Sequence, residues 1–158
     1  PEGGTCRRRG NVERVLTAGA ELATELDLAP GLSAQGSYTY TWAEVRRARG
    51  ERSLEGKRPP QLPEHQATLG LRRRLDRASF GFDGRFVARR FDDDLNSLAL
   101  AGFVTVDLSG RIELSPGIEL FAAVTNLFDE RYPVQRTSEG LTTLGAPNLA
   151  RIGLSARW

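Results

Sequence analysis

Residues Leu149 to Trp158 alternate between apolar and polar side chains up to the last position of the sequence. Successive side chains of an extended strand point to opposite faces. One face of this segment therefore carries Ala150, Ile152, Leu154, Ala156 and Trp158, and the other carries Arg151, Gly153, Ser155 and Arg157. The pattern predicts a strand with one apolar face and one polar face, with an aromatic residue at its end.

The same period of two recurs along almost the whole chain and predicts about seven strands. In chain order the predicted strands are 17–22, 32–42, 66–72, 79–89, 104–109, 118–128 and 149–158. The alternation is least regular in 118–128, because Phe121 and Leu127 fall on the face opposite Ile118 and Leu120. The predicted lengths are close to the roughly 9–11 residues that a tilted strand needs to cross a bilayer.

The connections between these strands alternate between short and long. Residues 27–30, 76–78 and 115–117 form short turns rich in Asp, Pro and Gly, whereas 44–64, 90–102 and 129–148 form long polar connections. Brief periplasmic turns and extended external loops alternate in this way in outer-membrane β-barrels. The alternation predicts that all three long loops lie outside the cell.

The amino-acid composition does not distinguish a membrane barrel from a soluble protein, because the two have similar compositions. The chain has 158 residues, of which 39% are hydrophobic and 27% charged, and the polar lumen face of each strand dilutes the apolar count of a barrel. No segment approaches the roughly 20 apolar residues of a membrane-spanning helix, so a spanning helix is excluded. The net charge of +2 is not gathered with aromatic residues, so we expect no nucleic-acid partner.

The chain offers little material for catalysis or metal binding. Cys6 has no second cysteine to pair with and no His at metal-ligand spacing, and His65 stands alone in the sequence. No nucleophile, base and orienting group converge along the chain. We therefore expect no enzyme activity, no catalytic residue, no cofactor and no bound metal.

Seven strands do not close a barrel in lipid, because the two outer strands would expose unpaired backbone groups. The polar face also carries charges such as Glu21, Arg72, Asp83 and Arg151, too many for a narrow, packed interior. These facts predict the final arc of a wider barrel. The sequence contains no methionine and begins at Pro1 without a signal peptide, so we interpret residues 1–158 as a carboxy-terminal portion and 1–11 as a loop remnant.

Several motifs, taken together, resemble those of TonB-dependent outer-membrane receptors. The segment from Asn126 to Tyr132, then Gly145-Ala146-Pro147, then the alternating end of the chain resemble the closing signature of that family. Gly19-Ala20-Glu21 resembles an earlier strand motif, and Arg90 to Asp93 with Asn96 resembles a loop motif. The resemblance extends from about Asn11 onward. One departure is Asn148, where the family often has Arg.

The resemblance implies an all-β, antiparallel transmembrane β-barrel of meander topology with roughly 22 strands, of which this chain supplies about seven. It implies a Gram-negative outer-membrane receptor with an amino-terminal plug and TonB box, both missing here, so TonB would act only through the missing plug. The expected function is energy-coupled uptake of a large nutrient, a ferric siderophore or a cobalamin-like chelate. By itself this chain would not transport it.

We predict three groups of functional residues. Ile152, Leu154, Ala156 and Trp158 form a membrane anchor and a signal for the barrel-assembly machinery; Tyr38, Tyr40, Trp42, Phe128 and Tyr132 form an interfacial aromatic belt in the lipid. Arg46, Arg47, Arg49 and Arg52 in the first long loop have the guanidinium groups that grip phosphates of lipopolysaccharide or an anionic metal chelate. The alternative for these arginines is a hydrated loop without a specific partner.

The acidic run Asp92 to Asp94 with Asn96 offers oxygen ligands, but its spacing is not that of a calcium loop, so a solvated acidic loop is preferred.

Two other functions remain open from the sequence. A passive outer-membrane pore would show the same alternation and the same loop lengths. A soluble β-sandwich binding module would also alternate, but its apolar face would lie beneath a second sheet.

Overall fold

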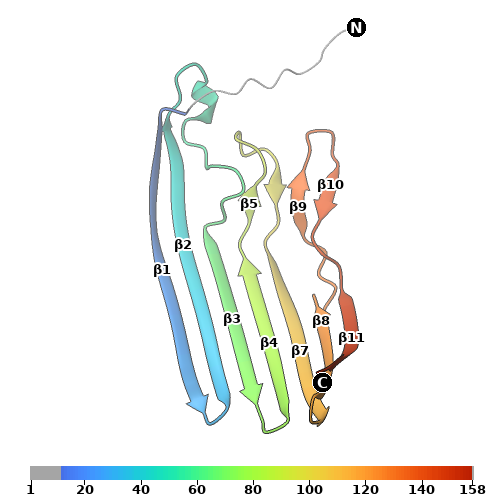
Figure 1. Cartoon of the computed structure of the whole chain (residues 1–158). Helices are drawn as coiled ribbons and strands as arrows, with labels where there is room; N and C mark the ends of the chain where they lie inside the picture. Colours follow the sequence, from blue (N-terminus) through green and yellow to red (C-terminus); the bar gives the residue numbers. More distant parts are fainter. Residues whose placement is uncertain (1–11, 158) are drawn as a thin grey trace.

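The computed structural model describes residues 12–157. Its main feature is one antiparallel sheet of seven strands in the order β1-β2-β3-β4-β7-β8-β11 (Figure 1). The strands are β1 (Arg14–Ala29), β2 (Leu32–Arg47), β3 (His65–Arg74), β4 (Ala78–Val87), β7 (Phe103–Ser115), β8 (Ile118–Thr125) and β11 (Leu149–Ala156). Each strand pairs with the next strand of the sheet along the chain, which confirms the predicted antiparallel meander.

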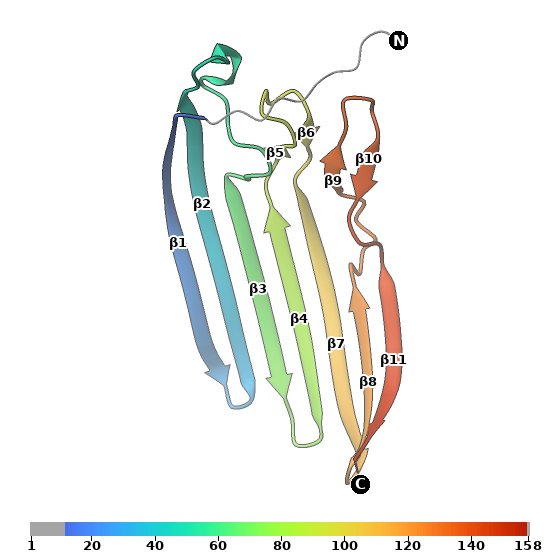
Figure 2. The same ribbon diagram turned by 45° about the horizontal axis from the view of Figure 1, so that its top comes forward.

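The long connections and the tight turns lie at opposite ends of the sheet, as Figure 2 shows. The short turns β1–β2 and β7–β8 each place a proline before a glycine with positive φ, at Gly31 (φ 70°) and Gly117 (φ 82°). Pro followed by such a Gly is the sequence of a type II turn. The long connections carry the 3-10 helix η1 (Arg52–Leu54), and two small hairpins. The hairpins pair β5 (Arg90–Phe91) with β6 (Ala99–Leu100), and β9 (Pro133–Arg136) with β10 (Thr142–Leu144).

The observed strands differ from the predicted ones mainly in length, and β7, for example, continues to Ser115 where the prediction ended at 109. β1 and β2 are 16 residues each, so their pairing continues into the predicted loop 44–64. The strand predicted over 118–128 ends at Thr125, and Leu127 lies beyond it. Phe121 interrupts the alternation because its ring covers Gly153 on the neighbouring strand; a Cβ atom there would lie 2.5 Å from that ring.

The strand register places all the alternating residues on two consistent faces. One row of paired residues crosses all seven strands and is apolar throughout: Leu26, Ala34, Leu71, Phe82, Leu108, Val124 and Ala150. The adjacent row lies on the other face and is mainly polar: Asp27, Ser33, Arg72, Gly81, Ser109, Ala123 and Arg151. A shift of one residue at any strand would mix these faces. Alternation within each strand is thus matched between strands.

The apolar face is not covered by any other layer of residues 12–157. On this face the exposed fraction reaches 66% for Leu22, 68% for Leu154 and 74% for Ile152. The buried apolar side chains lie instead near the loop end of the sheet, at positions such as Val45, Val87 and Leu100. The second sheet that the β-sandwich alternative requires is therefore not found over this face of the described chain. Within the same residues, no helix has the length and apolar character to cross a bilayer.

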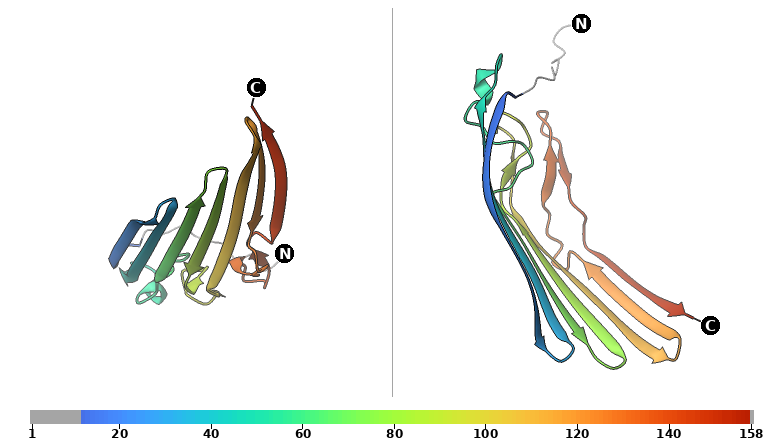
Figure 3. Two further views of the ribbon diagram at one scale, coloured as in Figure 1. Left: turned by 90° about the horizontal axis from the view of Figure 1, so that it is seen from below. Right: turned by 60° about the vertical axis from the view of Figure 1, so that its left-hand side comes forward.

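The sheet is curved and open at both sides. Seen from below, its strands follow an arc from β1 to β11 (Figure 3). Residues from β1 to β11, including Asp27, Arg72, Ser109 and Arg151, line one broad hollow on the polar face. β1 and β11 are the edge strands, each paired on one side. In a bilayer such edges require further strands, so the described sheet has the form of an arc of a wider barrel.

The two faces predict a difference between neighbouring substitutions in β11. In the full-length parent protein, Leu154→Arg places a charge on the apolar face and should destabilise the folded protein by about 2–4 kcal/mol near the bilayer centre. Ser155→Arg, on the polar face, is the matched control and should change stability little. Denaturant unfolding of the protein in lipid vesicles measures both. Equal effects would show that we have assigned the faces wrongly.

Candidate functional site

The polar face carries charged side chains that are paired across adjacent strands. Arg72 of β3 contacts Asp83 of β4 at 2.7 Å, and Arg111 of β7 contacts Glu119 of β8 at 3.6 Å. Arg72 also donates to the carbonyl of Phe82 at 2.9 Å. These side chains are partly exposed, so each pair contributes little to stability. Their main consequence is a hydrated, charged surface that suits a wide lumen.

The predicted aromatic residues of β2 do lie together at the loop end of the apolar face. Tyr40 pairs with His65 of β3, and the hydroxyl of Tyr38 lies 2.7 Å from Nδ1 of His65. The ring centroids of Tyr38 and Tyr40 lie 6.1 and 5.2 Å from that of His65. His65 is therefore held between two tyrosines, a contact that sequence reasoning missed because the residues are 27 and 25 positions apart.

The other aromatic residues have different surroundings. Phe128 is 75% exposed, as an anchor in lipid would be. The ring of Tyr132 instead stacks on Phe103 with a centroid distance of 4.0 Å, and it lies directly over Gly145. Phe103 lies two residues from Thr105, the register partner of Arg85, and therefore on the same face as Arg85, so the ring that Tyr132 contacts lies on the polar side of the sheet. The tight fit at Gly145 leaves no room for a larger residue.

The arginines of the first long loop do not form one cationic cluster. Arg46 pairs with Glu44 at 3.0 Å and lies over the ring of Trp42, and Arg49 pairs with Glu13 at 2.7 Å. Arg47 lies opposite Arg14 at the end of the β1–β2 ladder. Arg52 is in the 3-10 helix η1. Their role in binding phosphates stays a prediction.

The three long loops are joined to one another by side-chain hydrogen bonds that no sequence pattern indicated. Gln61 of the first loop accepts a hydrogen bond from Nε of Arg90 at 2.9 Å and donates to Asp92 and to the carbonyl of Val134. Asp92 in turn accepts a hydrogen bond from the backbone N–H of Arg136 at 2.6 Å. Residues from all three loops therefore meet around Gln61.

A second connection joins the first two loops through Asn96. Its side chain accepts a hydrogen bond from the N–H of Arg58 and donates one to the carbonyl of the same residue, both at 2.8 Å. Nearby, Asp93 accepts hydrogen bonds from the N–H groups of Ser97 and Leu98 and from the Ser97 hydroxyl. Burial raises the pKa of Asp93, but these hydrogen bonds outweigh it and hold the pKa below its ordinary value.

The acidic run differs from the predicted solvated loop, because Asp92 and Asp93 both accept hydrogen bonds from loop backbone. Among residues 12–157, no three or more His, Cys, Asp or Glu side chains are grouped to hold a metal ion.

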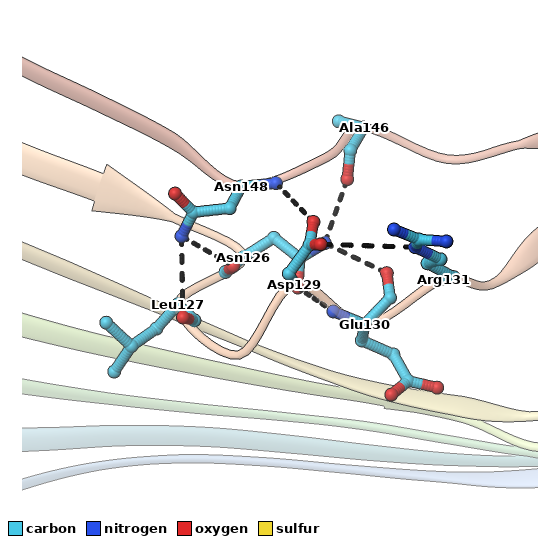
Figure 4. A network of polar contacts seen from close by, with 7 residues as sticks. All are labelled: Asn126, Leu127, Asp129, Glu130, Arg131, Ala146 and Asn148. Atoms are coloured by element: carbon cyan, nitrogen blue, oxygen red, sulfur yellow. Dashed lines mark hydrogen bonds and ion pairs between the residues drawn. The ribbon is translucent and has the colours of Figure 1, made fainter.

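The Asn126 to Tyr132 segment forms a compact hydrogen-bonded turn between β8 and β11, shown in Figure 4. Asn126 is 3% exposed and has φ 48°, a conformation that Asn tolerates better than most residues. Its side-chain amide donates to the carbonyls of Glu130 and Ala146, and its side-chain oxygen accepts from the N–H of Glu130. One side chain thus connects both ends of the third loop.

Further hydrogen bonds connect this turn to β7 and to the residue that precedes β11. The N–H of Asn126 donates to Asp107 of β7 at 2.8 Å. Asn148, the departure from the family pattern, donates from its side chain to the carbonyl of Asn126 at 3.0 Å and from its backbone to Asp129 at 3.1 Å (Figure 4). The segment therefore fixes where β8 ends and β11 begins.

The predicted assembly residues occupy the apolar face of β11. Ile152 pairs with Ala122, Leu154 with Leu120, and Ala156 with Ile118. Trp158 lies outside the described residues. The side chains are placed for contact with lipid or with another protein, and their recognition by an assembly machinery stays a prediction.

Replacing Asn126 should loosen the third loop. Asn126→Gly permits the positive φ but removes three side-chain hydrogen bonds, and we expect it to lower the unfolding free energy by about 2–4 kcal/mol. Glu130→Ala is the control, since it keeps the backbone groups that Asn126 contacts and should have little effect. Urea unfolding of the full-length parent in vesicles compares them. Equal stability of Asn126→Gly and the parent would show that the turn does not depend on this amide.

Comparison with known proteins gives the same architecture. The sequence family described as "TonB dependent receptor-like, beta-barrel" matches residues 1–127. The ferrichrome outer membrane transporter/phage receptor of Escherichia coli strain K12 is 29% identical over 140 residues, which are 83% of this chain and 17% of that protein.

Two solved structures share the fold at lower sequence identity. The siderophore receptor PiuA from Acinetobacter baumannii has a TM-score of 0.80 and 19% identity, over 90% of this chain and 22% of PiuA. The ferric yersiniabactin uptake receptor FyuA from Yersinia pestis has a TM-score of 0.71 and 21% identity, over 88% of this chain and 22% of FyuA. The chain spans less than a quarter of the length of each of these three proteins. It belongs to the TonB-dependent receptor family and is part of the β-barrel of a Gram-negative outer-membrane protein.

Proposed function

We propose that this chain is the carboxy-terminal arc of a receptor that takes up a ferric chelate across the outer membrane with energy relayed by TonB. In this proposal residues 1–158 supply the last seven strands of a barrel of roughly 22, and a plug elsewhere in the whole protein contacts TonB. The observation that carries it is the sheet itself, with an uncovered apolar face and a hollow, charged polar face. Such a sheet requires lipid on one side and water on the other.

The proteins that this chain resembles favour a ferric chelate as cargo. They are a ferrichrome transporter, a siderophore receptor and a ferric yersiniabactin receptor. A cobalamin-like chelate is the other cargo that the family resemblance allowed. We propose a ferric chelate in preference to a cobalamin-like chelate, because the names of these three relatives refer to siderophores or their iron complexes.

The dimensions of the apolar face also support a membrane position. Leu32 and Trp42 lie ten residues apart on the outer face of β2. At about 3.3 Å per residue and a tilt of about 40°, this stretch spans roughly 25 Å of the bilayer, the height of the apolar band of such barrels. Tyr38, Tyr40 and Trp42 then lie towards the outer interface, with Phe128 in the same belt. Arg46, Arg47, Arg49 and Arg52 lie just beyond it, where lipopolysaccharide phosphates are the proposed partners.

Energy-coupled uptake is distinguished from a passive pore by its dependence on TonB. We expect cells that produce the full-length parent as their only receptor to accumulate radiolabelled ferric chelate, and to lose this uptake when TonB is deleted. The matched control is a small sugar that enters through general pores, whose entry should not change. Undiminished chelate uptake without TonB would favour the passive pore.

The last strand and Trp158 provide a test of the assembly role. In the full-length parent, Trp158→Ser should lower the amount of folded receptor in the outer membrane without changing its synthesis, because an apolar, aromatic strand end is lost. Arg157→Ser, on the polar face, is the control. Surface labelling together with immunoblots of whole cells measures both quantities. Unchanged surface amounts for Trp158→Ser would exclude this residue as an assembly signal.

A further inference from the structure

Arg90 is a buried cation with an unused hydrogen-bond donor. It is 8% exposed, and it lies at the start of β5, beyond the end of β4. Its Nε donates to Gln61 at 2.9 Å and its Nη2 to the carbonyl of Pro133 at 3.4 Å, while the buried Nη1 has no hydrogen-bond partner in the described chain. Burying a charged group with an unsatisfied donor is costly, so this arrangement calls for a partner.

A second arginine lies close to it. The guanidinium groups of Arg85 and Arg90 lie 5.7 and 5.9 Å from the centroid of the same ring, that of Phe103, which also stacks on Tyr132. Burial lowers the pKa of Arg90, the positive charge of Arg85 lowers it further, and Asp92 acts in the opposite direction. Two like charges beside one aromatic ring repel each other, and the ring itself offsets only part of that repulsion.

No carboxylate of the described residues forms an ion pair with either arginine. Asp92 is the acidic residue whose charge acts on Arg90, but its two oxygens accept hydrogen bonds from Gln61 and from the N–H of Arg136. The positive charge of the pair is therefore not balanced by direct contact. An external anion at the exposed Arg85 would supply the missing negative charge beside both guanidinium groups.

The position of the pair fits a ligand that approaches from outside. Arg85 is exposed on the polar face near the loop end of β4, and Arg90 is held where the three long loops meet. Gln61 and Pro133 fix the guanidinium of Arg90 from two different loops before any ligand arrives. Such preorganisation reduces the entropy that binding would otherwise cost.

We propose that Arg85 and Arg90 bind an anionic group of the cargo, a carboxylate or catecholate oxygen of a negatively charged ferric chelate, against the aromatic surface of Phe103. This inference rests on the proposed uptake function and goes further, because it assigns the charge of the cargo and the residues that select it. An uncharged chelate would leave both guanidinium groups unpaired and should bind without their help.

The test uses the purified full-length receptor in detergent micelles and three probes. Ferric citrate and a ferric tris-catecholate are anionic, and ferrichrome is uncharged. We expect the receptor to bind at least one anionic probe, and Arg85→Gln to weaken that binding by about tenfold or more, because a charge-assisted hydrogen bond is lost. Arg89→Gln is the matched control: Arg89 is a neighbouring exposed arginine that lies over Phe91, and its loss should leave the affinity unchanged.

Arg90→Lys is a second variant, in case a larger change at this buried position prevents folding. It keeps the charge but loses the planar donor group, and we expect weaker binding of the anionic probe and reduced discrimination between probes.

Four results would overturn the inference. If Arg85→Gln and Arg89→Gln bind the anionic probe equally well, the pair does not select the cargo. If Arg85→Gln lowers the melting temperature of the ligand-free receptor without changing chelate affinity, a carboxylate elsewhere in the receptor holds the pair. If only uncharged ferrichrome binds, the uptake function stands and the assigned cargo charge is wrong. Failure of all three probes to bind, together with no uptake of iron by cells, would remove the proposed function and this inference with it.

Discussion

The arrangement of this chain depends on the removal of one face of its sheet from water without a protein layer to cover it. Leu22, Leu154 and Ile152 are mostly exposed, and the buried apolar side chains lie near the loops instead. A soluble protein of this size would lose stability by leaving a face of this kind in water. Contact with lipid hydrocarbon keeps this apolar face out of water. A lipid environment also explains why the backbone forms only paired strands within the sheet, since unpaired amide groups are costly in lipid.

The side chains of the polar face need not pack closely against one another, because this face borders a hollow. Its charges pair loosely across strands, as Arg72 and Asp83 do, and its residues line a hollow. Small residues there accommodate large neighbours, as Gly153 accommodates the ring of Phe121. The same sheet can therefore face hydrocarbon and water at once, and the alternation along each strand is the direct consequence.

Order at the loop end has a separate origin. Side-chain amides, not an apolar core alone, connect segments that are distant in sequence: Gln61 joins three loops, Asn96 joins two, and Asn126 closes the third onto itself. Loops tied in this way present a defined surface at the mouth of the barrel. In the proposed receptor, that is where a chelate would first meet the protein, and where the unbalanced charges of Arg85 and Arg90 lie.

The sequence by itself determined the number of strands in the sheet, their two faces and the alternation of short and long connections, because these follow from local alternation and from turn residues such as Pro30-Gly31. It was also sufficient for recognition of the family. Only the tertiary structure decided that Tyr132 stacks on Phe103 on the polar side, that the acidic residues Asp92 and Asp93 bind loop backbone, and that Arg90 is buried without a full set of partners. These contacts join residues up to 44 positions apart. Local periodicity carries no information about such contacts, because they depend on how separate loops fold over the end of the sheet.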